Sequence, residues 1–103
     1  MSEKAYVKNA CDKEQVKQAA QKERSRREHE LNDIRELLAT AEGKRFLWRL
    51  LEYCRTFESI WDASARIHYR SGQQDVGHFL MAEIVAADAD ALIVMMKAQT
   101  KED

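Results

Sequence analysis

The chain contains no proline and only three glycines, which are Gly43, Gly72 and Gly77. The turns of β-sandwiches depend on these two residue types, because glycine supplies positive φ angles and proline fixes the first turn position. Collagen-like, proline-rich and glycine/serine-linker architectures are also excluded, because they consist largely of these residues. In a chain of 103 residues, about the length of one small domain, the composition therefore predicts an all-α fold.

A charged segment occupies the first third of the chain. Between Asp12 and Glu36, fourteen residues are charged, seven of each sign, and good helix formers fill the gaps. We expect one helix from Asp12, as N-cap, to about Ala39. Its thin apolar stripe consists of Val16, Ala20, Leu31, Ile34 and Leu38. Only the C-terminal third is expected to be buried, so the rest is either a solvated or partly disordered arm or a helix that packs on sister subunits or a larger partner.

A second helix is expected after a break at residues 40–43. Thr40 is placed to act as its N-cap, and Glu42 suits the first helical turn. At 100° per residue, one broad arc of this helix contains Phe46, Leu47, Leu50, Leu51, Tyr53, Cys54 and Phe57. The arc predicts a helix buried along that side. Trp48 lies outside it, where the indole is either covered by a neighbouring helix or offered to a partner.

Two further helices are predicted in the last third of the chain. Residues 58–71 lack clean periodicity and are interpreted as a connection. A third helix is predicted from Gly72 to Ala87, and Asp88 or Asp90 caps a short fourth helix. Both helices are apolar on nearly every side, which is more than a bundle of about 65 residues can cover by itself. We therefore expect an oligomer or a docked subunit.

The expected organisation is a long charged N-terminal helix followed by a small three-helix bundle. We place a charged arm at residues 1–32, a helical domain at residues 33–99 and a tail at residues 100–103. The large apolar residues that such a bundle leaves uncovered are the candidates for subunit or partner contacts. They are Trp48, Phe79, Leu92, Ile93, Met95 and Met96.

Four basic residues within six positions form the best local case for contact with nucleic-acid phosphates. They are Lys22, Arg24, Arg26 and Arg27. Neighbouring glutamates offset their charge, no aromatic residue is interleaved for base stacking, and the whole chain has a net charge of −1. The alternative is pairing within the helix, such as Glu23 with Arg27. We expect nucleic-acid contact to be weak.

No constellation for chemistry is apparent in the sequence. The soft metal ligands are His29, His68, His78 and Cys54, and no pair has the spacing of a metal site on a helix. Cys11 and Cys54 lie in no CxxC motif, and Cys54 falls on the buried arc, where a thiol behaves as a small hydrophobe. We expect no catalytic, metal or cofactor site, no small-molecule substrate and no enzymatic activity. Neither a signal peptide nor a membrane span is predicted.

Gly77 falls inside the predicted third helix, where glycine costs about 1 kcal/mol relative to alanine. A close approach of the second helix, which brings Trp48 or Leu51 near, would explain a glycine at this position.

Two blocks of the sequence resemble a family of short helical proteins encoded by tailed, podovirus-type bacteriophages related to the Bordetella phages. The first block is Leu37-Leu-Ala-Thr-Ala-Glu-Gly-Lys-Arg-Phe-Leu-Trp-Arg-Leu-Leu-Glu-Tyr-Cys54. The second runs from Gly72 to Met96 and includes Gly77 and the step Ala87-Asp88. The resemblance covers residues 33–99 except the connection at 58–71.

The resemblance implies a phage product encoded among head and tail genes, and hence a virion component. The expected function is a structural protein near the portal, the head-to-tail junction or the internal core, or one ejected with DNA. Its partners would be other virion proteins and further copies of itself, and it would reside in the host cytoplasm before assembly. The alternative is a soluble regulator that binds a host protein or nucleic acid during infection. The resemblance supplies no catalytic residue.

Overall fold

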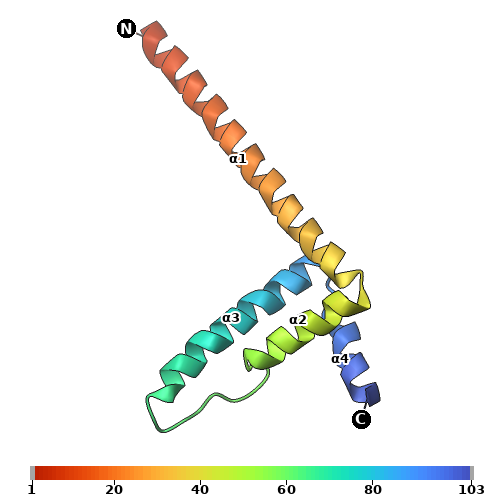
Figure 1. Cartoon of the computed structure of the whole chain (residues 1–103). Helices are drawn as coiled ribbons and strands as arrows, with labels where there is room; N and C mark the ends of the chain where they lie inside the picture. Colours follow the sequence, from red (N-terminus) through yellow and green to blue (C-terminus); the bar gives the residue numbers. More distant parts are fainter. Residues whose placement is uncertain (1, 103) are drawn as a thin grey trace. The chain divides into compact units, whose positions relative to one another are not determined.

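A computed structural model describes residues 2–102 and the side chains of residues 10–100. It contains the helices α1 (Ser2–Leu38), α2 (Ala41–Tyr53), α3 (Arg66–Ala87) and α4 (Ala91–Glu102), shown in Figure 1. No strand occurs among the described residues, so the predicted all-α fold is confirmed. The chain divides into two compact units, residues 1–30 and residues 31–103, and the division falls within α1.

Helix α1 begins ten residues before the predicted start, so Asp12 lies inside the helix and is not its N-cap. The preceding residues contain neither proline nor glycine, and nothing in them stops a helix. The apolar stripe is buried only toward the C-terminal third of the helix, as predicted, because Val16 is 67% exposed whereas Leu38 is 4% exposed. The last turns of α1 are also held by Arg35, whose Nε donates a 2.7 Å hydrogen bond to the carbonyl of Ala87.

The core of residues 31–103 forms where α2, α3 and α4 meet the last turns of α1. Its buried members are Leu38, Leu47, Leu51, Ile84, Ala91 and Met95. Leu51 and Ile84 are fully buried, which places the centre of the core between α2 and α3. These two helices run side by side in opposite directions, and α4 closes one end of the pair (Figure 1).

Helix α2 begins where the sequence predicts, because the backbone N–H of Gly43 donates to Oγ1 of Thr40 at 3.0 Å. Its predicted buried arc is wrong in part. Leu47, Leu51 and Cys54 are buried, but Phe46 and Tyr53 are more than half exposed. The helix is turned so that the Trp48 side contacts the core, since α4 packs there. Phe57, also placed on the arc, is 47% exposed and its ring stacks on the indole of Trp48 with centroids 5.5 Å apart.

The carboxyl end of α2 closes in a Schellman motif. The N–H of Thr56 donates to the carbonyl of Leu51 at 3.2 Å, and the N–H of Arg55 donates to that of Glu52 at 2.9 Å. The motif needs a left-handed residue, and Arg55 takes this position with a φ of 54°. Glycine is the usual residue there, because a side chain raises the energy of left-handed backbone.

Helix α3 begins at Arg66, six residues before the predicted start at Gly72. Its N-terminus is organised by Asp62, whose Oδ1 accepts hydrogen bonds from the N–H and the hydroxyl of Ser64 at 2.8 and 2.7 Å. Arg70 adds an ion pair to Asp62 at 3.2 Å. The hydrogen bonds from Ser64, with a smaller contribution from Arg70, hold the pKa of the Asp62 carboxyl below its usual value of 3.8.

The close approach predicted at Gly77 is present, but the residues that make it are different. A Cβ built at Gly77 would lie 2.9 Å from Cβ of Cys54 and would overlap Oγ1 of Thr56. The segment that follows α2 therefore approaches α3 here, and Trp48 and Leu51 are not the nearest residues. Gly72, by contrast, has open space around it.

Helix α4 begins after Asp88, whose carboxylate accepts the N–H of Asp90 at 3.1 Å and whose carbonyl accepts that of Ala91 at 3.2 Å. The helix continues to Glu102, so the segment predicted as a tail is helical through that residue.

Candidate protein-contact surface

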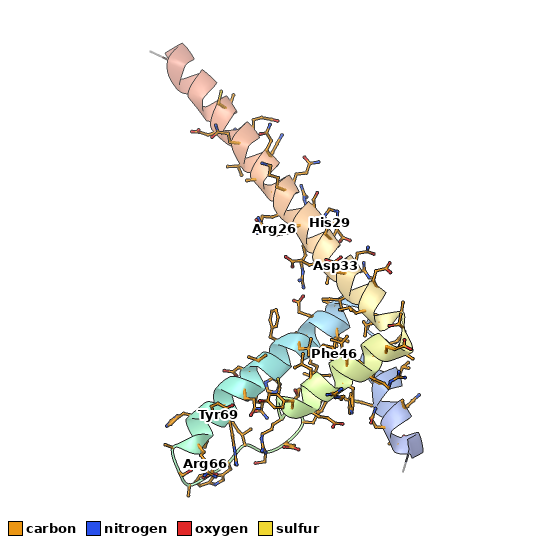
Figure 2. The ribbon with its side chains drawn as sticks, in the orientation of Figure 1. Arg26, His29, Asp33, Phe46, Arg66 and Tyr69 are labelled. Carbon is orange, nitrogen blue, oxygen red and sulfur yellow. The ribbon has the colours of Figure 1, made fainter. Side chains whose placement is uncertain are left out.

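One face of the α2–α3 pair exposes large apolar side chains. We call it the α2–α3 apolar face, and it consists of Phe46, Leu50, Tyr53, Tyr69, Val76 and Phe79. Leu50 is half-buried, and the other five side chains are between 56% and 71% exposed. Spacings of seven residues align Phe46 with Tyr53 along α2 and Tyr69 with Val76 along α3. Figure 2 shows Phe46 on α2 and Tyr69 near the start of α3.

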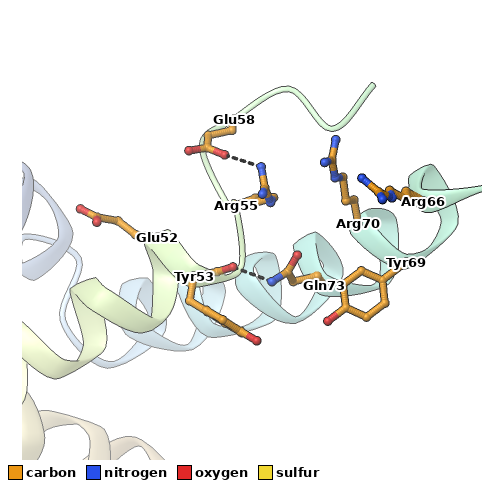
Figure 3. A pocket seen from close by; sticks show the side chains of 8 residues that line it. All are labelled: Glu52, Tyr53, Arg55, Glu58, Arg66, Tyr69, Arg70 and Gln73. Atoms are coloured by element: carbon orange, nitrogen blue, oxygen red, sulfur yellow. Dashed lines mark hydrogen bonds and ion pairs between the residues drawn. The ribbon is translucent and has the colours of Figure 1, made fainter. Parts of the chain in front are cut away.

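Contacts at the carboxyl end of α2 show that the exposed apolar residues of α2 and those of α3 lie on the same side of the helix pair. The side-chain amide of Gln73 donates a 2.6 Å hydrogen bond to the carbonyl of Tyr53. Tyr53 and Tyr69 line one cleft together, with Gln73 between them (Figure 3). Because α2 and α3 are antiparallel, Phe46 and Leu50 then lie beside the part of α3 that carries Val76 and Phe79.

Two charged residues border the face on α2. Arg49 and Glu52 line a shallow hollow of about 490 Å³ together with Phe46, Leu50 and Tyr53. Both charged side chains are exposed. Among the described residues, neither Arg49 nor Glu52 has an ion-pair partner. The border therefore presents one unpaired positive and one unpaired negative group, about one helical turn apart.

A cleft of about 540 Å³ lies at the end of the α2–α3 pair. Three arginines line it, but Arg55 is paired with Glu58 at 3.3 Å and Arg70 with Asp62 at 3.2 Å. Arg66 and Glu52, both among the described residues, also line the cleft without an ion pair between them, and their charges cancel in the sum. The charges of this group balance, so the cleft has no net attraction for an anion.

The side-chain amide of Gln74 fixes the connection around the cleft. It donates to the carbonyls of Arg55 and Glu58, at 2.8 Å each. Gln74 thus holds the start of the connection in place, and the adjacent Gln73 holds the carbonyl of Tyr53 at the end of α2. Glutamines on a helix next to an irregular segment are the available signal, since carbonyls without a helical partner accept side-chain donors.

The model of a protein family, the Bbp19-like phage proteins, matches residues 34–97. This match covers more than half of the chain. The chain belongs to the Bbp19-like phage protein family. The resemblance to a phage family is thereby confirmed over nearly the same residues on which it was based. Searches of curated proteins and of solved structures gave no match.

The part of the chain shared with the Bbp19-like family contains the whole α2–α3 apolar face and the core beneath it. It excludes Lys22, Arg24, Arg26 and Arg27, the predicted phosphate contacts. The match therefore falls on the helical domain of this Bbp19-like chain, whereas the charged segment before residue 34 is outside it.

The predicted contact residues of this Bbp19-like protein divide between core and surface. Met95 is 2% exposed and fills the core of its own chain, so its prediction as a contact residue is corrected. Trp48 and Leu92 are half-buried and pack against the same core. Phe79, Ile93 and Met96 are exposed, and their contact with another subunit stays a prediction. Sequence reasoning missed Phe46 and Tyr53, because it placed both on the buried arc.

The four basic residues of α1 do not form one positive stripe. Lys22 and Arg26 lie on one side of the helix, and Arg24 and Arg27 lie roughly opposite. Arg26 pairs with Glu23 at 3.2 Å and Arg27 pairs with Glu30 at 3.2 Å, so intrahelical pairing occurs with different partners from the expected one. Contact of these residues with phosphates stays a prediction.

Trp48 has a buried indole Nε1 that finds no hydrogen-bond partner among the described residues. The indole borders a cavity of about 280 Å³ between α2 and α4, which is lined by apolar and long side chains such as Met95 and Gln99. Within residues 10–100, no three His, Cys, Asp or Glu side chains gather where they could hold a metal ion. None of the described helices is both long and apolar enough to cross a membrane.

Proposed function

We propose that this member of the Bbp19-like phage family is a virion-associated structural protein that acts through protein–protein contacts of the α2–α3 apolar face. Its place in the particle would be the portal, the head-to-tail junction, the internal core or the set of ejected proteins. No catalytic step is assigned to the protein. Its partners are other virion proteins and further copies of the same chain.

The observation that supports this proposal is the exposure of five large apolar side chains on one side of a small helical domain. Contiguous apolar patches of more than a few hundred Å² are uncommon on monomeric proteins, and they mark contact sites. Four of the side chains on this face are aromatic, and aromatic residues are enriched at the centres of interfaces.

Mass spectrometry of purified particles tests the proposal. The phage that encodes this chain is grown with the native gene, and the gene product is quantified against the major capsid protein in intact virions. We expect a fixed copy number in every preparation. If the protein is abundant in infected cells but absent from virions, the proposal is overturned and the regulator interpretation takes its place.

A pair of matched variants tests the face itself. Tyr69→Ser removes an aromatic side chain from the face, and Trp61→Ser removes one of equal exposure from the connection outside it. We expect Tyr69→Ser to lower the number of copies in virions and Trp61→Ser to leave it unchanged. Equal incorporation of both variants would contradict the use of this face.

A further inference from the structure

We propose that a second copy of this chain covers the α2–α3 apolar face, in a two-fold dimer whose two α2 helices run antiparallel and cross near Leu50. Arg49 of each copy then pairs with Glu52 of the other. This inference rests on the proposed function, because both assign contacts to the same face.

The spacing of residues along α2 makes the face complementary to itself. Measured from Leu50 at about 1.5 Å per residue, Phe46 lies about 6 Å toward one end and Tyr53 about 4.5 Å toward the other. An antiparallel copy reverses these positions, so Phe46 meets Tyr53 of the second copy on both sides of the axis. Leu50 meets its own counterpart level with the two-fold axis, on the flank of α2 opposite to the flank of Arg49 and Glu52.

The bordering charges select the antiparallel orientation. Arg49 lies about 1.5 Å from Leu50 along the helix and Glu52 about 3 Å away on the other side, so the reversal sets opposite charges beside each other at both ends. A parallel pair would instead set Arg49 against Arg49 and Glu52 against Glu52, which is unfavourable. Among the described residues, both groups lack an ion-pair partner within their own chain, so both are free for this contact.

Helix α3 adds to the same interface. Helix α3 lies beside α2, and both helices contribute to the exposed face. The two-fold rotation therefore brings Val76 and Phe79 of both copies toward each other. Four aromatic side chains of roughly 200 Å² each, about two-thirds exposed, together with Val76 offer roughly 600 Å² of apolar surface per copy. The total of roughly 1,200 Å² is at the lower limit of a specific interface, so we expect a dissociation constant on the order of micromolar.

Charge reversal tests the dimer. Sedimentation velocity of the full chain is measured at protein concentrations from about 1 to about 100 micromolar, a range that includes the expected dissociation constant. Arg49→Glu and Glu52→Arg should each weaken the dimer by about tenfold, because each change disrupts two symmetric pairs. The double variant restores opposite charges across the interface and should recover most of the loss. Lys97→Glu, an exposed reversal on α4, is the control and should leave the constant unchanged.

A cross-linking measurement tests the orientation. In a Cys11→Ser background, Leu50→Cys places a thiol next to the two-fold axis and should form an intermolecular disulfide on mild oxidation. Trp61→Cys, exposed but outside the face, should cross-link much less. Circular dichroism of every variant verifies that the helices are intact.

Three results would overturn the dimer: a monomer at all concentrations, a dimer insensitive to both charge reversals, or single reversals that the double variant does not rescue. None of them would remove the protein from virions. Failure of this inference is therefore distinguishable from failure of the proposed function, which is decided by the copies found in particles.

Discussion

At the scale of single residues, two glycines of α3 have opposite surroundings. Gly77 is buried where the segment after α2 crosses α3, and Thr56 occupies the place that a side chain would need. The Thr56 hydroxyl cannot easily move away, because it donates a 2.7 Å hydrogen bond to the carbonyl of Leu51. Gly72 is exposed and has no heavy atom near its missing Cβ. The sequence predicted a close approach at Gly77, but only the structure shows which atoms make it.

Alanine substitutions at the two glycines should move stability in opposite directions. Gly77→Ala should destabilise the fold by about 1–3 kcal/mol, because the new methyl group overlaps packed atoms. Gly72→Ala should stabilise it by about 0.5–1 kcal/mol, since alanine favours the helix and meets nothing. Urea denaturation followed by circular dichroism measures both changes. Equal effects of the two substitutions would contradict the packing described at Gly77.

The left-handed backbone at Arg55 gives a second prediction at this scale. Arg55→Gly should be more stable than Arg55→Ala by about 1 kcal/mol, because both variants lose the exposed ion pair with Glu58 but only glycine relieves the unfavourable φ. Thermal melting of the two variants measures the difference. Identical melting temperatures would show that Arg55 is not left-handed in solution.

At the scale of elements, the sequence predicted helices well and their exposed sides less well. The cap at Thr40 was recognisable because a threonine three residues before Gly43 is a local signal. The rotation of α2 about its own axis is not recognisable from the sequence, because the apolar arc is wide enough for either of its sides to face the core. Docking of α4 against Trp48 decides it, and that contact joins segments far apart in the sequence.

The start of α3 was missed because its signal is an aspartate with a serine two residues later, and no pattern of apolar residues accompanies it. Asp62 holds this helix end best in its charged form, since a carboxylate accepts the two hydrogen bonds from Ser64 more strongly than a neutral carboxyl and the ion pair with Arg70 needs the charge. The pKa of Asp62 is lower in the folded chain than its usual 3.8, so its stabilising effect is present above that value.

A pH titration tests this helix start. As pH falls below 3.8 and through the lowered pKa of Asp62, the folded chain should lose this contribution to its stability. Asp62→Asn should show a smaller change in melting temperature across the same range than the native chain. The carboxyl carbon signal of Asp62, followed by NMR, should titrate below 3.8, and a midpoint above that value would contradict the assignment.

At the scale of the whole molecule, composition was enough for the fold class and the resemblance was enough for the family. Prediction of the contact surface was less complete. Met95 was assigned to the surface because α4 is apolar on all sides, and the sequence alone does not indicate which side meets the core. Phe79 is exposed and its contact with another subunit stays a prediction, whereas Phe46 and Tyr53 are exposed against the prediction, because a surface formed by two helices depends on how they pair. The apolar excess that suggested an oligomer is real, because large apolar side chains are exposed on α2, α3 and α4.

The continuity of α1 across the division between the two units has a consequence for how its charged part becomes helical. Starting a helix costs far more than extending one, and isolated helices of such polar sequence are marginal in water. The turns from Leu31 to Leu38 are held by Ile34 and Leu38 in the core and by the Arg35 hydrogen bond, so they act as a ready nucleus. Residues 10–30 need only propagate from it. We therefore expect the helicity of residues 10–30 to depend on the folding of residues 31–103.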